Sequence, residues 1–167
     1  MQITSRVVRV AALAAAVGAL TGAAQAHEVF YWANLSGPSE APPNNSGGSG
    51  WSFVTVDLDL ATMRVQCSFT GLVGTTTASH IHGPTVNPFE GTAGVMTTTP
   101  TFAGFPLGVT FGDYDITLDL TASSTYNPAF VNASGGTISQ AMNRMLLAFE
   151  QGRAYHNIHT TAFPGGE

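Results

Sequence analysis

Three histidines in two short phrases are the residues of this chain whose types and spacing point most clearly to chemistry. His80 and His82 flank Ile81, and His159 follows Ile158 near the end of the chain. Successive side chains of a β-strand point to opposite faces, so His80 and His82 share the face opposite Ile81. If both isoleucines enter one core, all three imidazoles turn outward. The pattern therefore predicts that His80, His82 and His159 lie close together on the outer face at one end of the fold.

Three converging imidazoles form a set of nitrogen ligands that is typical of copper or zinc sites. Asn157, which shares a face with His159, and Glu40 could support such ligands by hydrogen bonds from outside the coordination sphere. The alternative is that the imidazoles bind no ion. They would then hydrogen-bond to the backbone and to Glu40 or Glu167 and hold the strand ends together.

The first 26 residues have the pattern of a secretory signal peptide. Arg6 and Arg9 form a positive start, residues 10–20 are an apolar run too short to span a bilayer, and Ala24-Gln25-Ala26 fits a cleavage site. We therefore expect a secreted or periplasmic protein whose mature part, residues 27–167, is one domain. No later apolar run is long enough to cross a membrane.

Cleavage after Ala26 would leave His27 as the first residue of the mature chain. The free amine and the imidazole of His27 could then chelate copper as a histidine brace, which makes it a further candidate metal ligand. This hypothesis requires His80 or His82 to lie beside His27 in the fold.

Charge and cysteine content exclude several classes of protein. The chain has no lysine, and loss of Arg6 and Arg9 with the signal peptide takes the formal net charge from −5 to −7. Nucleic-acid binding needs a basic surface, so we expect no nucleic-acid partner. Cys67 is the only cysteine, which rules out an intramolecular disulfide. The sequence contains no Walker A, H-E-x-x-H or G-x-S-x-G motif, and nothing in it groups a catalytic triad.

Alternation of apolar and polar residues predicts an all-β protein. The runs with strand character are residues 28–36, 51–60, 63–69 and 114–120. The middle two runs predict an antiparallel hairpin with one buried face. We expect Val54, Val56, Leu58 and Leu60 to lie on that buried face.

One segment has helical rather than strand spacing. Apolar residues recur at near-helical intervals over residues 137–150, Thr137 with Gln140 fits a capping box, and Gly152 fits the position beyond the helix end. We expect a single short helix there, leading into the strand that carries His159. Residues 84–108 are rich in Thr, Gly and Pro, which predicts a long loop with at most one short strand.

Several phrases together resemble the CHRD domain, a family named after chordin and found also in bacterial secreted proteins. They follow the family's order and span nearly all of the mature chain: residues 35–43 (LSGPSEAPP), 69–72 (FTGL), 78–84 (ASHIHGP), 155–160 (YHNIHT) and 164–167 (PGGE). The resemblance implies an immunoglobulin-like, Greek-key antiparallel β-sandwich, and it implies no established activity. Two positions depart from the family. His156 replaces a usually apolar residue, and the chain stops at Glu167, where the family adds a short strand.

Three functional interpretations are open. The preferred one is a secreted, non-enzymatic binding or structural module that contacts an extracellular protein or matrix partner. The second is an extracytoplasmic copper- or zinc-binding protein that uses His80, His82 and His159. The third is a metal-dependent redox enzyme, because the His-x-His phrase resembles a copper-binding phrase of Cu/Zn superoxide dismutases. The chain lacks the further histidines and the disulfide of those enzymes, which argues against their chemistry.

Overall fold

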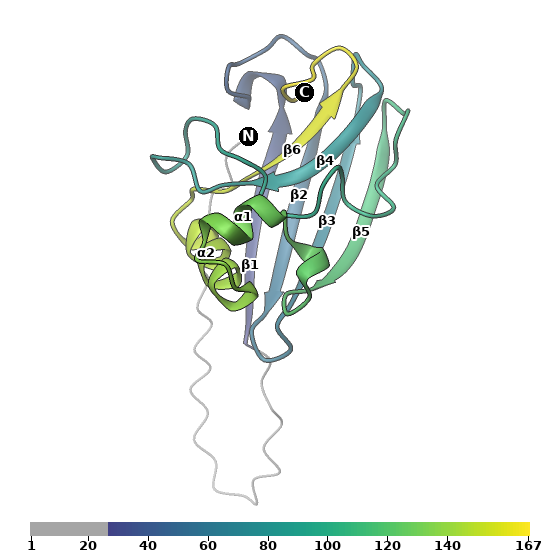
Figure 1. The fold of residues 1–167 in the computed structure, drawn as a ribbon. Helices are drawn as coiled ribbons and strands as arrows, with labels where there is room; N and C mark the ends of the chain where they lie inside the picture. Colours follow the sequence, from purple (N-terminus) through teal and green to yellow (C-terminus); the bar gives the residue numbers. More distant parts are fainter. Residues whose placement is uncertain (1–26) are drawn as a thin grey trace, which may run out of the picture.

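The computed structural model describes residues 27–167, so the predicted signal peptide lies outside the described residues. The described chain forms two antiparallel sheets with the core between them (Figure 1). The larger sheet has the order β1-β2-β3-β5, and the smaller one pairs β4 with β6. The strands are β1 (Glu28–Ser36), β2 (Ser49–Asp57), β3 (Thr62–Thr70), β4 (Thr76–His82), β5 (Gly112–Asp119) and β6 (Tyr155–Thr160). The predicted all-β sandwich is confirmed, although this strand order does not by itself establish the immunoglobulin Greek key.

Alternation gives the four-stranded sheet one buried face. Val54 on β2 lies opposite Val65 on β3, and both side chains are buried in the core. The alternation of β2 ends earlier than predicted, because Asp57 Oδ1 accepts the backbone N–H groups two and three residues further on and turns the chain. Leu60, predicted to be buried, is therefore 71% exposed, and Leu58 is exposed as well.

The predicted helix is α2 (Ile138–Glu150). Thr137 is its N-cap, and the Oγ1 atom of Thr137 accepts the backbone N–H of Gln140 at 3.3 Å. The capping box is only partial, because the Gln140 side chain accepts the Thr137 hydroxyl at 2.8 Å instead of a backbone N–H. Gly152 stands just beyond the helix with a φ of 65°, a conformation that favours glycine, as its position predicted.

The helices share a layer with the small sheet, over the inner face of the large one (Figure 1). Phe149 of α2 stacks on Tyr31 of β1 with ring centroids 5.1 Å apart, which joins this layer to the large sheet. The sequence did not predict the short helix α1 (Pro128–Ala133), because six residues are too few to show a period. Among the described residues, no helix is both long and apolar enough to span a membrane.

Pairing of β4 with β6 brings the two histidine phrases together. Six residues share the face of this sheet that points away from the core, in the cross-strand pairs His80–Asn157, His82–Tyr155 and Ala78–His159. Ile81 and Ile158 occupy the opposite face and are buried in the core. The predicted direction of both isoleucines is therefore confirmed.

The long segment between β4 and β5 follows the other edge of β4. The backbone N–H groups of Met96 and Phe102 donate to the carbonyls of Ile81 and Ser79 at 2.9 and 3.0 Å. The segment forms isolated β-bridges but no continuous strand, in keeping with the predicted loop. Its path carries residues 93–100 alongside the histidine-bearing end of β4.

Candidate metal centre

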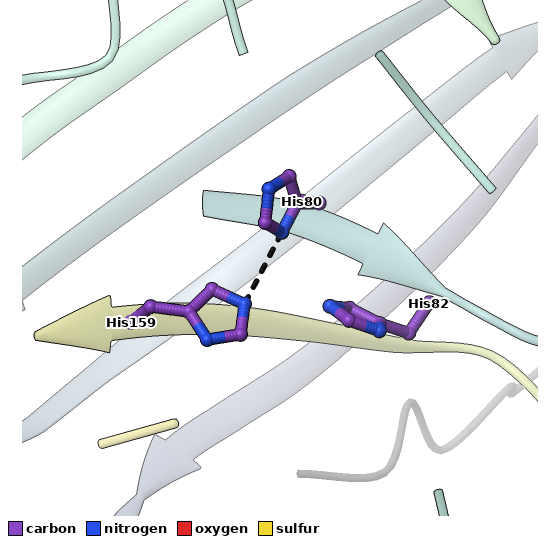
Figure 2. A group of neighbouring side chains, drawn as sticks. All are labelled: His80, His82 and His159. Carbon is purple, nitrogen blue, oxygen red and sulfur yellow. Dashed lines mark hydrogen bonds between the residues drawn. The ribbon is translucent and has the colours of Figure 1, made fainter. Parts of the chain in front are cut away.

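The structure brings His80, His82 and His159 into one cluster. One ring nitrogen from each residue lies within 4.8 Å of the others, and the ring centroids are 4.9 to 5.6 Å apart. Two rings come from β4 and one from β6, and Figure 2 shows them gathered around a common point. The proximity that the two phrases predicted is confirmed.

Each of the three rings also donates a hydrogen bond to a backbone carbonyl on the side away from the other two. The pairs are His80 Nε2 with Pro100 O at 2.5 Å, His82 Nδ1 with Ala93 O at 2.9 Å, and His159 Nδ1 with Pro164 O at 2.8 Å. A carbonyl oxygen only accepts, so the ring nitrogen that faces it must carry the hydrogen. The carbonyls therefore select one tautomer for each neutral imidazole.

The nitrogens that remain are lone-pair acceptors, and they face one another. His159 Nε2 lies 3.2 Å from His80 Nδ1. Two neutral rings with these tautomers have no hydrogen to share across that contact. His82 Nε2 is buried and has no hydrogen-bond partner among the described residues. Such an arrangement needs a proton or a metal cation between the rings.

The cluster is more enclosed than the sequence predicted. His80 is 7% exposed and His82 is 8% exposed, while His159 is partly exposed. The rings do lie on the face of β4 and β6 that points away from the core, but this face is not open surface. The carbonyl-bearing segments around Ala93, Pro100 and Pro164 close over it, so the expected surface site is a buried one.

Burial also sets the charge state of the two histidines on β4. Desolvation lowers the pKa of His82 from 6.5 to about 4, and it lowers the pKa of His80 as well. Both rings are therefore neutral at pH 7. A neutral imidazole is the form that coordinates a metal ion, so no proton has to be displaced from these two side chains.

Tyr155 helps to position His82, a role that the sequence did not indicate. Its ring stacks on His82 with centroids 4.9 Å apart and an interplanar angle of 16°. Its hydroxyl donates to the carbonyl of Ala93 at 3.2 Å and accepts the Ala93 N–H at 3.1 Å. Tyr155 thus holds the same carbonyl that orients His82. The signal available in the sequence was its place on the same face of the strand as His159.

The remaining predicted candidates lie outside this cluster. His27 is an exposed residue whose Nδ1 lies 3.1 Å from Asp59 Oδ1, and the structure does not bring it to the other three histidines, which the histidine brace required. The Asn157 amide donates to the carbonyl of Gly165 at 2.9 Å. The Glu167 carboxylate accepts from Ser46, Gly74 and Thr160.

His156 belongs to the opposite face of β6 and has a different role. Its side chain is fully buried, with Nδ1 2.8 Å from Ser52 Oγ on the large sheet and Nε2 2.7 Å from Ser79 Oγ on β4. It therefore ties the two sheets together through the core. His156 lies two residues before the buried Ile158 on the same strand, and this spacing could have placed His156 on the core face of β6.

A protein-family model is the comparison with known proteins that found a match to this chain. No curated protein and no solved structure matches the chain. The family model of the CHRD domain matches residues 31–167, which covers every strand that contributes to the cluster. This match extends over most of the sequence and includes both β4 and β6, so the chain belongs to the CHRD domain family.

Proposed function

We propose that this CHRD domain is a non-enzymatic metal-binding module that holds one copper or zinc ion through His80, His82 and His159. The observation that supports this function most strongly is the set of three ring nitrogens that face one another without hydrogens, each fixed by a carbonyl on the far side of its ring. In known metal sites a ligating histidine usually donates its second ring N–H to a carbonyl, carboxylate or water, which fixes the orientation of the ring. The three carbonyls have this role here.

The geometry needs little adjustment to accept such an ion. In a tetrahedral site with Zn–N bonds of about 2.0–2.1 Å, two ligand nitrogens lie roughly 3.4 Å apart. The His80–His159 contact is already 3.2 Å, and His82 has to approach by roughly 1 Å or somewhat more. The fourth position would be left for water or another ligand. Because affinities generally rise from zinc to copper(II), we expect copper(II) to bind more tightly than zinc.

Metal titration of the protein and of one variant tests this function. Purified protein should bind one ion per chain, and His82→Ala should lower the affinity for the ion at least tenfold. Tenfold is the smallest loss usually seen when a residue that only hydrogen-bonds to a metal ligand is removed. His27→Ala is the matched control, because His27 is exposed and lies outside the cluster. An affinity that falls equally in both variants, or no binding at micromolar ion, would contradict the proposal.

A hydrogen-bonded cluster without metal is the second candidate, and the three bonds to carbonyls favour it. One proton shared between His80 and His159 would satisfy their 3.2 Å contact. His82→Ala would then lower the free energy of unfolding by about 1 kcal/mol for its lost hydrogen bond and leave metal affinity unchanged. The same titration, paired with urea denaturation, therefore separates the two candidates. Superoxide and peroxide turnover by metal-loaded protein, compared with the free ion, tests the redox interpretation.

We propose in addition that the protein acts outside the cytoplasm. The support is the pattern of Arg6, Arg9, the apolar run and Ala24-Gln25-Ala26. Sequencing the N-terminus of exported protein should give His27 as the first residue. Protein that stays in the cytoplasm with Met1 in place would refute this proposal.

A further inference from the structure

The outer face of the large sheet carries a strip of four aromatic side chains. The helices and the small sheet cover the other face of this sheet (Figure 1). The aromatic strip consists of Phe30 and Trp32 from β1 and of Trp51 and Phe53 from β2. Phe30, Trp32 and Trp51 are 45%, 43% and 47% exposed. Contiguous exposed apolar surface of this kind marks interaction sites and ligand-binding grooves in soluble proteins.

Strand pairing makes the four rings continuous. Trp32 lies opposite Phe53, and Phe30 stacks on Phe53 with ring centroids 5.9 Å apart. Trp51 lies two residues before Phe53 on the same face of β2, opposite Asn34. From Phe30 to the level of Asn34 the aromatic strip spans four residues of β1, which is roughly 13 Å. That length suits a ligand with several rings in a row better than one with a single ring.

A shallow groove of about 460 Å³ adjoins the aromatic strip. Phe30 and Phe53 of the strip line it, together with polar side chains that include Thr55, Arg64 and Gln66. The volume is in the range of small-molecule sites. Aromatic rings and hydrogen-bonding groups therefore border the same space, which suits a ligand with an apolar face and a polar edge.

Asp115 holds the two largest polar side chains of this groove in place. Arg64 Nε donates to Asp115 Oδ1 at 2.8 Å, and Gln66 Nε2 donates to Asp115 Oδ2 at 3.0 Å. Arg64 Nη1 and Gln66 Oε1 then have no hydrogen-bond partner in the described part of the chain. The Arg64 side chain is 50% exposed, so a ligand from solvent can reach it. A donor and an acceptor held side by side match hydroxyl groups, each of which both donates and accepts.

Charge narrows the choice of ligand. Among the described residues that line the groove, Arg64 is the only positively charged one, and Asp115 neutralises it in a salt bridge. Glu28 and Asp57 add negative charge at the groove, and the chain has no lysine. Such a surface does not attract nucleic acid or an acidic polysaccharide, and a second copy of the chain would bring the same acidic groups. The surface is complementary to a neutral ligand.

We propose that the aromatic strip and its groove bind a neutral oligosaccharide. The sugar rings stack on the strip, because the negative faces of aromatic rings attract the weakly positive C–H groups of a pyranose. The hydroxyl groups of one sugar unit bond to Arg64 and Gln66 at the groove. A proline-rich peptide also docks on aromatic side chains, but it offers mainly carbonyl acceptors and few donors. The site lies on the other sheet from the histidine cluster and goes beyond the proposed metal binding.

Tryptophan fluorescence tests the proposal in the full mature protein. Trp32 and Trp51 are the only tryptophans of the chain, and both belong to the strip, so their emission reports on it directly. The protein is titrated with cellohexaose, chitohexaose and xylohexaose, which are neutral chains of pyranose rings. At least one of them should change the emission saturably and bind more tightly than its own monosaccharide, because several linked rings stack at once.

Four results of this titration would overturn the proposal. One is the absence of any change with all three neutral probes at millimolar concentration, and another is a hexasaccharide that binds no more tightly than its monosaccharide. Tighter binding of hexagalacturonate or of a decaproline peptide would point to an anionic ligand or to a peptide. A blue shift that grows with protein concentration in the absence of sugar would assign the strip to a second copy of the chain.

Variants assign the binding to the strip and the groove, with calorimetry as the measurement. Phe30→Ala and Phe53→Ala should each weaken binding of the tightest neutral probe at least about fivefold, the lower end for loss of a stacking ring. Phe53→Tyr keeps the ring and should bind as the wild-type protein does. Gln66→Ala should weaken binding by about threefold, for one lost hydrogen bond. Phe111→Ala is the matched control, because Phe111 is exposed but lies outside the strip and the groove lining.

These variants keep the proposal falsifiable even where one of them is unstable. If Phe53→Ala does not fold, as judged by circular dichroism, Phe30→Ala and Gln66→Ala still decide the outcome. Unchanged affinity in both of those variants would refute the site. His82→Ala should bind the sugar with wild-type affinity, because His82 belongs to the small sheet. Loss of sugar binding in His82→Ala would overturn the independence of the two sites.

Discussion

At the level of single residues, the direction in which each imidazole faces decides what it can do. His156 and His159 lie three residues apart on β6, so they point to opposite faces. His159 meets two other rings beside a carbonyl, whereas His156 is enclosed between two serine hydroxyls in the core. Identical side chains are thereby divided between a candidate ligand and a link between the sheets.

His156 should make the fold sensitive to acid. Desolvation lowers its pKa in the folded protein from 6.5 to about 3. Below pH 6.5 the unfolded chain takes up a proton that the folded chain cannot bind, so stability is lost as the pH falls toward 3. For one such proton the free energy of unfolding decreases by about 1.4 kcal/mol per pH unit. Urea denaturation at pH 7, 5 and 4 measures this slope.

The variant His156→Leu isolates that contribution. At pH 7 it should be less stable by about 1–3 kcal/mol, because Ser52 and Ser79 lose their imidazole partner. Its stability should then fall less steeply with acid, so the two curves approach each other. A slope in His156→Leu equal to that of the wild-type protein would show that His156 is not the titrating group.

At the level of elements, the cluster depends on the register between β4 and β6 and on the irregular segment beside β4. The antiparallel pairing puts His80 opposite Asn157 and His82 opposite Tyr155. A shift of one residue would send the histidines into the core and the isoleucines out of it, so burial of Ile81 strongly selects this register. The helix α2 leads into β6 and so determines where that strand begins.

Thr137 at the start of α2 offers a direct test at this scale. Thr137→Ala removes the side chain that accepts the Gln140 N–H, and it should lower the free energy of unfolding by about 1 kcal/mol. Ser139→Ala is the matched control, because Ser139 is exposed inside the helix and is not the N-cap. Urea denaturation midpoints of the two variants measure the difference. Equal midpoints would contradict a stabilising N-cap.

At the level of the whole molecule, the metal centre would connect parts of the chain that are remote in sequence. Its ligands come from β4 and β6, and the carbonyls that hold them come from residues 93–100 and from Pro164. An ion bound there stabilises only the folded chain, because the unfolded chain does not present the three rings together. Binding and folding are therefore linked.

This linkage predicts a rise in the melting temperature on metal addition. At a free ion concentration of 100 times Kd the stabilisation is about 2.7 kcal/mol. For a domain of this size that corresponds to a rise of roughly 5–10 °C. Thermal denaturation followed by circular dichroism measures the shift, and His82→Ala should show little of it at the same ion concentration. A rise of equal size in His82→Ala would place the ion elsewhere.

The sequence by itself determined the elements whose patterns are local. An apolar run predicted β1, and alternation predicted the β2–β3 hairpin and β5. Helical spacing with Thr137 predicted α2, and the expected burial of Ile81 and Ile158 predicted that the three histidines would meet. Where a local pattern continued past its element, as at Leu58 and Leu60, the prediction failed because the Asp57 turn ended the strand. The short helix α1 had no period to detect.

Only the tertiary structure decided how the histidines are enclosed and oriented. The carbonyls of Ala93, Pro100 and Pro164 come from irregular segments whose paths follow from contacts with the rest of the fold and not from any periodicity. Those contacts set the tautomers and bury two of the rings. Strand parity states which face a side chain takes. Whether that face is open or covered depends on chain segments far away in sequence, and that is why a predicted surface site became a buried one.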